Sequence, residues 1–261
     1  NTLIGISAYN GATTDNVSVT SVDVSGGIYG ISTLNFGTGF TTVTSTGTVT
    51  GTSAAGIDAR NFSVASTDLT ITAFDVNSDL TGIVARNNGS GATTVTSTGT
   101  VIGTNGFGID AQNTGATSTN LTVNANDVTG GGFAALFAAN NGVGNTSITS
   151  TGTITGTANN GIYATNAVTA GDLIVDVADV SGATDGMVIR NNGTGVTDIT
   201  VSGLISGGTL NGIYARGNGT SMTINANDVT GNTNGIWARG YGSGATTITT
   251  TATRGTGAEL W

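Results

Sequence analysis

The chain has 261 residues, including 44 glycines, and contains no proline, cysteine, histidine or lysine. These absences exclude histidine- and cysteine-based catalysis, Schiff-base and P-loop lysines, disulfide scaffolds and His/Cys zinc sites. The formal net charge of −9 argues against nucleic-acid binding, and no apolar run approaches the length of a transmembrane span.

The sequence consists of ten copies of one repeat, and the first element of each copy is a Gly-Ile-x-Ala-x-Asn motif. The motif begins at Gly5, Gly30, Gly56, Gly82, Gly108, Ala135, Gly161, Gly186, Gly212 and Gly235. The copies are 23 to 27 residues apart, with no linker or charge run between them, which indicates a single domain. We expect the motif to form a short strand whose two x positions point outward.

Asparagine ends this first element in eight repeats. The column contains Asn10, Asn35, Asn61, Asn87, Asn113, Asn140, Asn166 and Asn191, and then Gly217 and Gly240. Because both residue types accept a left-handed backbone, the column predicts a corner with positive φ. Stacked amides can also hydrogen-bond along the array, so we interpret Asn61, Asn87, Asn113, Asn140, Asn166 and Asn191 as a structural corner ladder without a ligand.

Two further strands are expected after the motif in each repeat. The first contains an apolar column that should face the interior: Val17, Val43, Leu69, Val95, Leu121, Ile148, Leu173, Ile199, Met222 and Ile248. The residue that follows this position is polar in nine repeats, and such alternation predicts a strand with one buried face. The second of these strands carries a valine or isoleucine column that begins with Val24, Val49 and Val76.

Two types of repeat alternate, so that the true unit is about 52 residues long. Asp-type repeats have an aspartate before the valine of the last strand, and Thr-type repeats have threonine or leucine there. The aspartates are Asp23, Asp75, Asp127, Asp179 and Asp228. Asp-type repeats are expected to contain one additional residue between the two strands that follow the motif, as an alternating corner or bulge. Because these aspartates recur regularly, we interpret them as corner residues that accept backbone N–H groups.

Three short strands in about 26 residues, separated by Gly/Asn corners, predict an all-β, three-faced parallel β-helix of about ten coils. At about 4.8 Å per coil, the rod would be roughly 45 Å long. We expect the array to cover 1–252 and a C-terminal tail, 253–261, to lie out of register.

The segment Gly-Ala-Thr-Thr-Val-Thr-Ser-Thr-Gly-Thr-Val (91–101), followed by Gly-Phe-Gly-Ile-Asp-Ala-Gln-Asn (106–113), resembles passenger-domain repeats of large Gram-negative autotransporter adhesins. The likeness covers essentially the whole chain. It implies a right-handed parallel β-helix at the cell surface or outside a Gram-negative bacterium, acting as an adhesin or filament. Neither the signal peptide nor the membrane barrel of that family is visible, so we interpret the chain as a fragment of a longer array.

One outward column of the motif strand becomes aromatic toward the C-terminus, and arginines occupy the outward position two residues later. The candidate contact strip consists of Tyr163, Arg190, Tyr214, Arg216, Trp237 and Arg239. Aromatic and guanidinium groups can stack sugars or bind anionic glycans. The alternative is an aromatic ladder with arginines packed along it, which stabilises only the sheet.

Threonine pairs suggest ice binding as an alternative function. The pairs are Thr44/Thr46, Thr70/Thr72, Thr96/Thr98, Thr149/Thr151 and Thr249/Thr251. Regular threonine arrays on β-solenoids resemble those of ice-binding proteins, although Asn124, Ile174, Asp176 and Asn225 interrupt this one. Threonine is also the ordinary polar residue of an exposed strand.

A polysaccharide-active enzyme on the same fold is the second alternative, and it would need non-repeated acids clustered in a groove. No such cluster is visible in the sequence, and no Asp-x-Asp-x-Asp-Gly calcium loop occurs, although a calcium site shared between stacked Asp corners stays open. We therefore predict a non-enzymatic protein without catalytic, metal or cofactor sites. The expected partners are a cell-surface glycan, a host or abiotic surface, and further copies of its own repeats stacked end to end.

Overall fold

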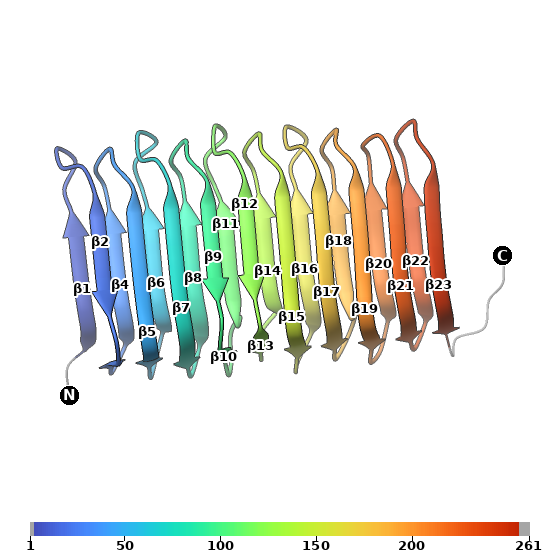
Figure 1. Ribbon diagram of the computed structural model, residues 1–261, viewed down its shortest axis with the longest axis horizontal. Helices are drawn as coiled ribbons and strands as arrows, with labels where there is room; N and C mark the ends of the chain where they lie inside the picture. Colours follow the sequence, from blue (N-terminus) through green and yellow to red (C-terminus); the bar gives the residue numbers. More distant parts are fainter. Residues whose placement is uncertain (1–2, 256–261) are drawn as a thin grey trace.

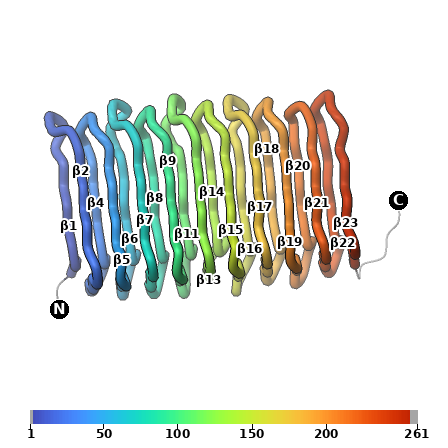
Figure 2. Tube along the Cα trace, in the orientation of Figure 1, coloured from blue at the N-terminus to red at the C-terminus, as the bar shows by residue number. Residues whose placement is uncertain are grey.

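The computed structural model describes residues 3–255, and every regular element among them is a β-strand (Figure 1). The chain winds into ten coils that follow one another in sequence order along a rod (Figures 1 and 2). The described residues include no helix that is long and apolar enough to cross a membrane. The predicted all-β parallel solenoid of about ten coils is therefore confirmed.

Each coil contributes one strand to the first of two parallel sheets. The strands are β1 (Ile4–Asn10), β4 (Tyr29–Asn35), β6 (Ala55–Asn61), β8 (Thr81–Asn87), β11 (Ile109–Asn113), β14 (Ala134–Asn140), β16 (Asn160–Asn166), β18 (Met187–Asn191), β20 (Asn211–Gly217) and β22 (Asn234–Gly240). They coincide with the ten motifs. The register pairs equivalent motif residues, for example Ile57 with Ile83 and Ile83 with Ile109.

The second sheet contains both of the other strands predicted for each repeat. Its strands are β2 (Val17–Ser21), β3 (Val24–Gly26), β5 (Thr41–Gly51), β7 (Leu69–Ser78), β9 (Thr93–Ser97), β10 (Thr100–Gly103), β12 (Leu121–Ala125), β13 (Asp127–Gly130), β15 (Thr146–Gly156), β17 (Leu173–Gly182), β19 (Thr197–Gly207), β21 (Met222–Gly231) and β23 (Thr246–Gly255). Only β2/β3, β9/β10 and β12/β13 remain separate strands. The solenoid has two sheets and not three faces, because the junction between the two predicted strands is a bulge rather than a corner.

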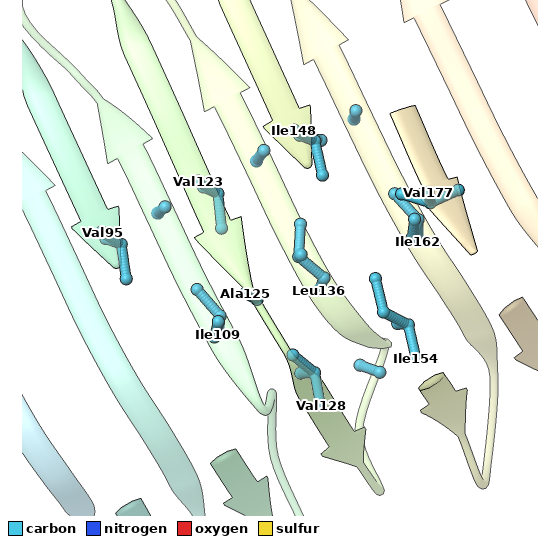
Figure 3. Packing of buried hydrophobic residues seen from close by; sticks show 14 of the residues in the cluster. Val95, Ile109, Val123, Ala125, Val128, Leu136, Ile148, Ile154, Ile162 and Val177 are labelled. Atoms are coloured by element: carbon cyan, nitrogen blue, oxygen red, sulfur yellow. The ribbon is translucent and has the colours of Figure 1, made fainter. Parts of the chain in front are cut away.

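The hydrophobic core fills the space between the two sheets. Figure 3 shows Ile109 and Leu136 of the first sheet projecting into the same layer as Val95, Val123 and Ile148 of the second. All five side chains are fully buried. One continuous cluster of such residues extends from the first coil to the ninth. Burial of each large side chain contributes roughly 1.5 to 3 kcal/mol, so the core columns are the main stabilising element of the rod.

The register of the second sheet corrects the apolar column that was predicted from the sequence. Leu69 pairs with Thr41 and Thr93, whereas Val43 pairs with Ile71. The same shift of two residues recurs in every Thr-type coil, so an apolar residue of one coil stacks on a threonine of the next. These threonines face the core, and Thr41 and Thr93 are fully buried.

The alternating bulge is present, but the prediction assigned its additional residue to the wrong type of coil. Ser45 and Thr48 of a Thr-type coil are three residues apart, whereas their partners Ala73 and Asp75 are two residues apart. The additional residue therefore belongs to the Thr-type coils. The predicted column placed Val95 opposite Leu121, whereas Leu121 pairs with Thr93. This offset of two residues made the segment in the Thr-type coil look one residue shorter than its partner, although it is one residue longer.

The repeated aspartates hold these bulges in place. The carboxylate of Asp75 accepts the backbone N–H of Thr100 in the following coil at 2.8 Å. Equivalent bonds occur at three other junctions between coils. Glycine precedes the bulge threonine because a Cβ on Gly99 would overlap the Asp75 carboxylate. The aspartates thus accept backbone N–H groups, as their regular recurrence predicted.

The asparagine column lies inside the solenoid, where the first-sheet strands end. No described residue has a positive φ, so the predicted left-handed corner is wrong. All eight asparagines are buried, and amide–amide hydrogen bonds along the rod axis join them at four of the seven steps between coils. Asn61 Nδ2 donates to Asn87 Oδ1 at 3.1 Å, and Asn113 Nδ2 donates to Asn140 Oδ1 at 3.3 Å. Hydrogen bonding, rather than backbone conformation, explains the choice of asparagine.

The same amides also satisfy carbonyl groups of the loops that follow them. Asn166 Nδ2 donates to the carbonyl oxygens of Gly171 and Asp172, at 3.2 and 2.9 Å. Asn191 Nδ2 donates to the Val196 carbonyl oxygen at 3.0 Å. These asparagines therefore attach the loops that follow them to the ends of the first-sheet strands.

Buried threonines complete this network in alternate coils. Three hydroxyl groups donate to asparagine Oδ1 atoms of the following coil, each at 2.6 Å: Thr41 to Asn61, Thr93 to Asn113 and Thr146 to Asn166. In the ninth coil Gly217 replaces the asparagine, and the Thr197 hydroxyl is buried without a hydrogen-bond partner. Of the four buried threonines in this column, three thus have an asparagine acceptor one coil away, and Thr197 has none.

The repeat register extends further toward the C-terminus than predicted. Thr253 and Gly255, at the end of β23, pair with Val229 and Gly231. The expected break at residue 253 is therefore wrong for 253–255. The remainder of the predicted tail, 256–261, lies outside the described residues.

Replacing a buried threonine hydroxyl by a methyl group tests the threonine–asparagine bond. We expect Thr93→Val to destabilise the protein by about 1 to 2 kcal/mol, because Asn113 loses a buried donor. Thr197→Val should stabilise it by about 1 kcal/mol, because the change removes an unsatisfied buried hydroxyl. Chemical denaturation followed by circular dichroism measures both changes in the free energy of unfolding.

Gly217→Asn provides the matched control, since it supplies the missing acceptor. The atoms nearest to a Cβ at this position belong to the side chains of Thr197 and Met222 and not to the backbone. In the Gly217→Asn background, Thr197→Val should no longer stabilise the protein. Equal effects of Thr93→Val and Thr197→Val in the unmodified protein would contradict the assigned bond.

Candidate functional site

The outer face of the first sheet places five of the six arginines in one outward column. In coil order the column is Tyr9, Leu34, Arg60, Arg86, Gln112, Ala139, Thr165, Arg190, Arg216 and Arg239. The arginines form a pair in the third and fourth coils and a row of three in the eighth to tenth coils. We call Arg190, Arg216 and Arg239 the arginine row.

The arginine pair is neutralised by aspartates of the neighbouring outward column. Arg60 Nε lies 2.6 Å from Asp58 Oδ1, and Arg86 Nη2 lies 2.6 Å from Asp110 Oδ2. Gln112 Nε2 donates to the other oxygen of Asp110 at 2.6 Å. Both aspartates are buried, with 4% and 1% of their surface exposed. Neither guanidinium group is therefore available as an isolated positive charge.

These four charged side chains line a pocket that sequence analysis missed. Tyr29, Leu80 and Phe107 form apolar parts of its wall. Burial raises the pKa of Asp58 above its ordinary value of 3.8, although the hydrogen bond from Arg60 opposes the rise. Asp58 and Asp110, two non-repeated acids, thus line one pocket, although no such cluster was visible in the sequence. The available signal was that Asp58 and Asp110 occur two coils apart in a column without other acids.

The arginine row has different surroundings. None of its three members forms an ion pair with a residue in the described range 3–255. Arg190 Nη1 donates to the Tyr163 hydroxyl at 2.7 Å, and Arg216 Nη2 donates to Asn192 Oδ1 at 2.9 Å. The partners of these guanidinium groups are neutral, so the positive charges remain uncompensated.

Aromatic rings hold the guanidinium groups in place. The Arg190 guanidinium carbon lies 5.3 Å from the ring centroid of Tyr163 and 5.6 Å from that of Tyr214. The guanidinium carbon of Arg239 lies 4.6 Å from the ring centroid of Tyr241. Tyr241 was not predicted as a site residue, because it follows the motif and belongs to neither outward column. Cation–π contacts of this kind are worth about 0.5 to 1 kcal/mol at exposed sites.

The two C-terminal aromatic residues of the predicted strip contact each other. The rings of Tyr214 and Trp237 stack with centroids 4.5 Å apart and an interplanar angle of 2°. Since they come from adjacent coils, their faces point along the rod axis. Tyr214 lies between Trp237 on one side and Arg190 on the other. All six predicted strip residues thus lie together on one face, but the face of Tyr214 is not open for sugar stacking.

The arginine row concentrates positive charge on a strongly acidic protein. The three residues pair in register, and adjacent coils are about 4.8 Å apart. Like charges opposite each other on neighbouring strands are destabilising. In addition, the Nε atoms of Arg190 and Arg216 are buried without hydrogen-bond partners. A carboxylate, sulfate or phosphate group can neutralise such a row and accept its N–H groups.

Most of the repeated aspartates bind backbone groups of neighbouring coils. Among the described residues, no group of three or more acidic side chains is arranged to hold a metal ion. Four of the five repeated aspartates instead accept a backbone N–H of the next coil. The arginine row is therefore the candidate site with the clearest chemical requirement for a ligand.

Comparison of the chain with protein-family models, with curated proteins and with solved structures found no match in any of the three.

The buried Asp58 carboxyl makes stability depend on pH in a specific direction. Because its pKa is raised on folding, the folded protein retains this proton at pH values where the unfolded chain has lost it. The stabilising contribution is complete below 3.8, the ordinary pKa, and is lost as the pH rises through the folded-state pKa. We expect the Tm of the wild-type protein to fall over this interval relative to that of Asp58→Asn.

Asp58→Asn is a suitable comparison because asparagine retains an oxygen that can accept the Arg60 N–H. Thermal unfolding of both proteins, measured in steps between about pH 3 and pH 7, gives the difference in Tm. A difference that is constant across this range, or that changes in the opposite direction, would contradict the raised pKa.

Proposed function

We propose that this chain is part of a non-enzymatic extracellular rod that binds acidic glycans through the arginine row. One observation carries the proposal: Arg190, Arg216 and Arg239 stand in register on an outer face without an acidic partner in the described chain. Three adjacent guanidinium groups without acidic partners are unusual in a protein with a net charge of −9. An anionic ligand supplies the charge that the chain does not.

The construction of the rod supports binding to an extended surface. Parallel strands connect each coil to the next through both sheets, and the core is continuous along the array. A row of cations on such a rigid support contacts several groups of one polymer without losing much conformational freedom. Further copies of the repeats, joined end to end, would add equivalent contacts and increase avidity.

The resemblance to autotransporter passenger repeats supports the location of this function. In that family the solenoid is presented outside a Gram-negative cell, where acidic polysaccharides and host glycans are accessible. The contact surface of this chain would then serve in adhesion to such a polymer. The rod would act as a spacer that carries the contact away from the cell.

Recognition through charge, rather than through sugar stacking, agrees with the ring geometry. Tyr214 contacts Trp237 and Arg190 on its two faces, so the aromatic residues position the guanidinium groups. The non-enzymatic assignment is supported by the bonding in the acidic pocket. Asp110 accepts hydrogen bonds on both oxygens and Asp58 accepts one from Arg60, so these carboxylates already have protein partners.

A triple variant, Arg190→Gln with Arg216→Gln and Arg239→Gln, tests the arginine row. We expect the wild-type protein to bind an immobilised sulfated or polyuronate polysaccharide and not a neutral one. The triple variant should bind at least about tenfold more weakly, because hydrogen bonds to charged groups contribute about 1.5 to 3 kcal/mol each. Binding should weaken as salt is added, since exposed charges are screened. A surface-binding assay at several salt concentrations measures both effects.

Arg60→Gln combined with Arg86→Gln is the matched control. It removes positive charge from the same outward column, but at residues that are already paired with aspartates. We expect less than a twofold change in affinity, provided circular dichroism shows that the variant is folded. Equal losses in the two variants, or no binding of acidic polymers by the wild-type protein, would contradict the proposal.

A further inference from the structure

The outer face of the second sheet carries an array of hydroxyl groups that becomes regular only in the observed register. Two outward columns run through the first six coils. The first contains Ser18, Thr42, Thr70, Thr94, Thr122 and Ser147, and the second contains Thr20, Thr44, Thr72, Thr96, Asn124 and Thr149. Eleven of these twelve residues have a hydroxyl group. We call the twelve positions the hydroxyl lattice.

The lattice differs from the threonine pairs that the sequence suggested. Thr44 pairs with Thr72 and Thr96, so it belongs to the second column, whereas Thr70 belongs to the first. Thr46 and Thr98 lie outside both columns, at the bulges. Of the four interruptions expected from the sequence, only Asn124 falls within the first six coils. In the observed register the outward hydroxyl groups therefore form a nearly complete array, whereas the threonine pairs suggested by the sequence were interrupted.

The hydroxyl groups of the lattice are free to bind water. None of them hydrogen-bonds to a protein group within the described chain, in contrast to the buried Thr41 and Thr93 hydroxyls. All twelve side chains are exposed or half-buried, and none is charged. The lattice ends at the seventh coil, where Ile174 and Asp176 occupy the two columns.

The fold gives these groups a fixed two-dimensional spacing. Neighbouring coils are about 4.8 Å apart, and outward residues on one strand are about 6.7 Å apart. Threonine is β-branched, so its side chain has restricted rotation and presents its hydroxyl and methyl groups in few orientations. Figure 2 shows the coils stacked with closely similar outlines, so that successive rows lie on one continuous face. Water bound to this face is held at regular positions.

We propose that the hydroxyl lattice binds the surface of ice crystals through an ordered layer of water. A crystal surface matches an uncharged array that is periodic over six coils, because the water positions of the crystal also repeat in two dimensions. The arginine row lies on the other sheet, so this activity and the proposed glycan binding can occur on separate faces. The inference therefore does not depend on the proposed function.

One lattice position, Asn124, has no hydroxyl group. A substitution that supplies one is expected to increase ice binding. Asn124 lies in a hollow lined by Thr96, Thr98, Thr149 and other polar residues. Asn124→Thr would place a hydroxyl group at the vacant lattice position between Thr96 and Thr149. The array would then be complete across all six coils.

Thermal hysteresis and inhibition of ice recrystallisation test the proposal with the intact chain. We expect the wild-type protein to show both effects, and Thr94→Lys to reduce the thermal hysteresis at least twofold by placing a charge at the centre of the lattice. Asn124→Thr should increase the hysteresis. Thr223→Lys is the matched control, because Thr223 continues the first column in the ninth coil, beyond the lattice.

Circular dichroism of each variant establishes that the solenoid is folded. A wild-type protein that behaves like serum albumin in both ice assays would overturn the proposal. So would equal losses in Thr94→Lys and Thr223→Lys, or a failure of Asn124→Thr to increase activity. The triple arginine variant should retain full ice activity, which separates this result from that of the glycan-binding test.

Discussion

Parallel, in-register stacking places each side chain of this solenoid beside its counterpart in the next coil, and this constraint determines which residues each column accepts. Equivalent residues of neighbouring coils are about 4.8 Å apart. A residue type can therefore fill a column only if it packs well against the same residue type, and otherwise it must alternate with a different one. Isoleucine and valine tolerate copies through van der Waals packing. Asparagine tolerates them because an amide both donates and accepts hydrogen bonds. A buried asparagine column can therefore persist through eight coils.

Carboxylates in adjacent coils would repel each other, and this explains why the repeated aspartates occur in every second coil. Asp75 accepts a backbone N–H from the bulge of the next coil, where a second aspartate would repel it. The Thr-type coil supplies that N–H, and its glycine leaves room for the carboxylate. Asp58 and Asp110 follow the same rule, because Val84 separates them. The threonine–asparagine bond shares this period, so both polar networks alternate together.

The sequence allowed the ten coils, the first-sheet strands and the arginine column to be predicted, since the motif repeats with little variation. It did not reveal the register of the second sheet. Alternation places Thr41 on the same face as Val43, but its polarity argues against a core position; Asn61 in the next coil accepts its hydroxyl and permits burial. This contact joins residues 20 positions apart, so no single strand displays it. The same shift concealed the hydroxyl lattice, and the pocket around Asp58 and Asp110 appears only when coils are stacked.

The arginine row stacks like charges in adjacent coils without acidic partners among residues 3–255, unlike the other charged residues discussed above. Arg60 and Arg86 also occupy adjacent coils, but each is paired with an aspartate. In the described chain, Arg190, Arg216 and Arg239 stack without such compensation. Locally unfavourable arrangements of like charges tend to occur at functional sites. Stacked threonines cost little, so the role proposed for the hydroxyl lattice rests on its unpartnered hydroxyls, whereas the role proposed for the arginine row rests on repulsion that an anionic ligand would remove.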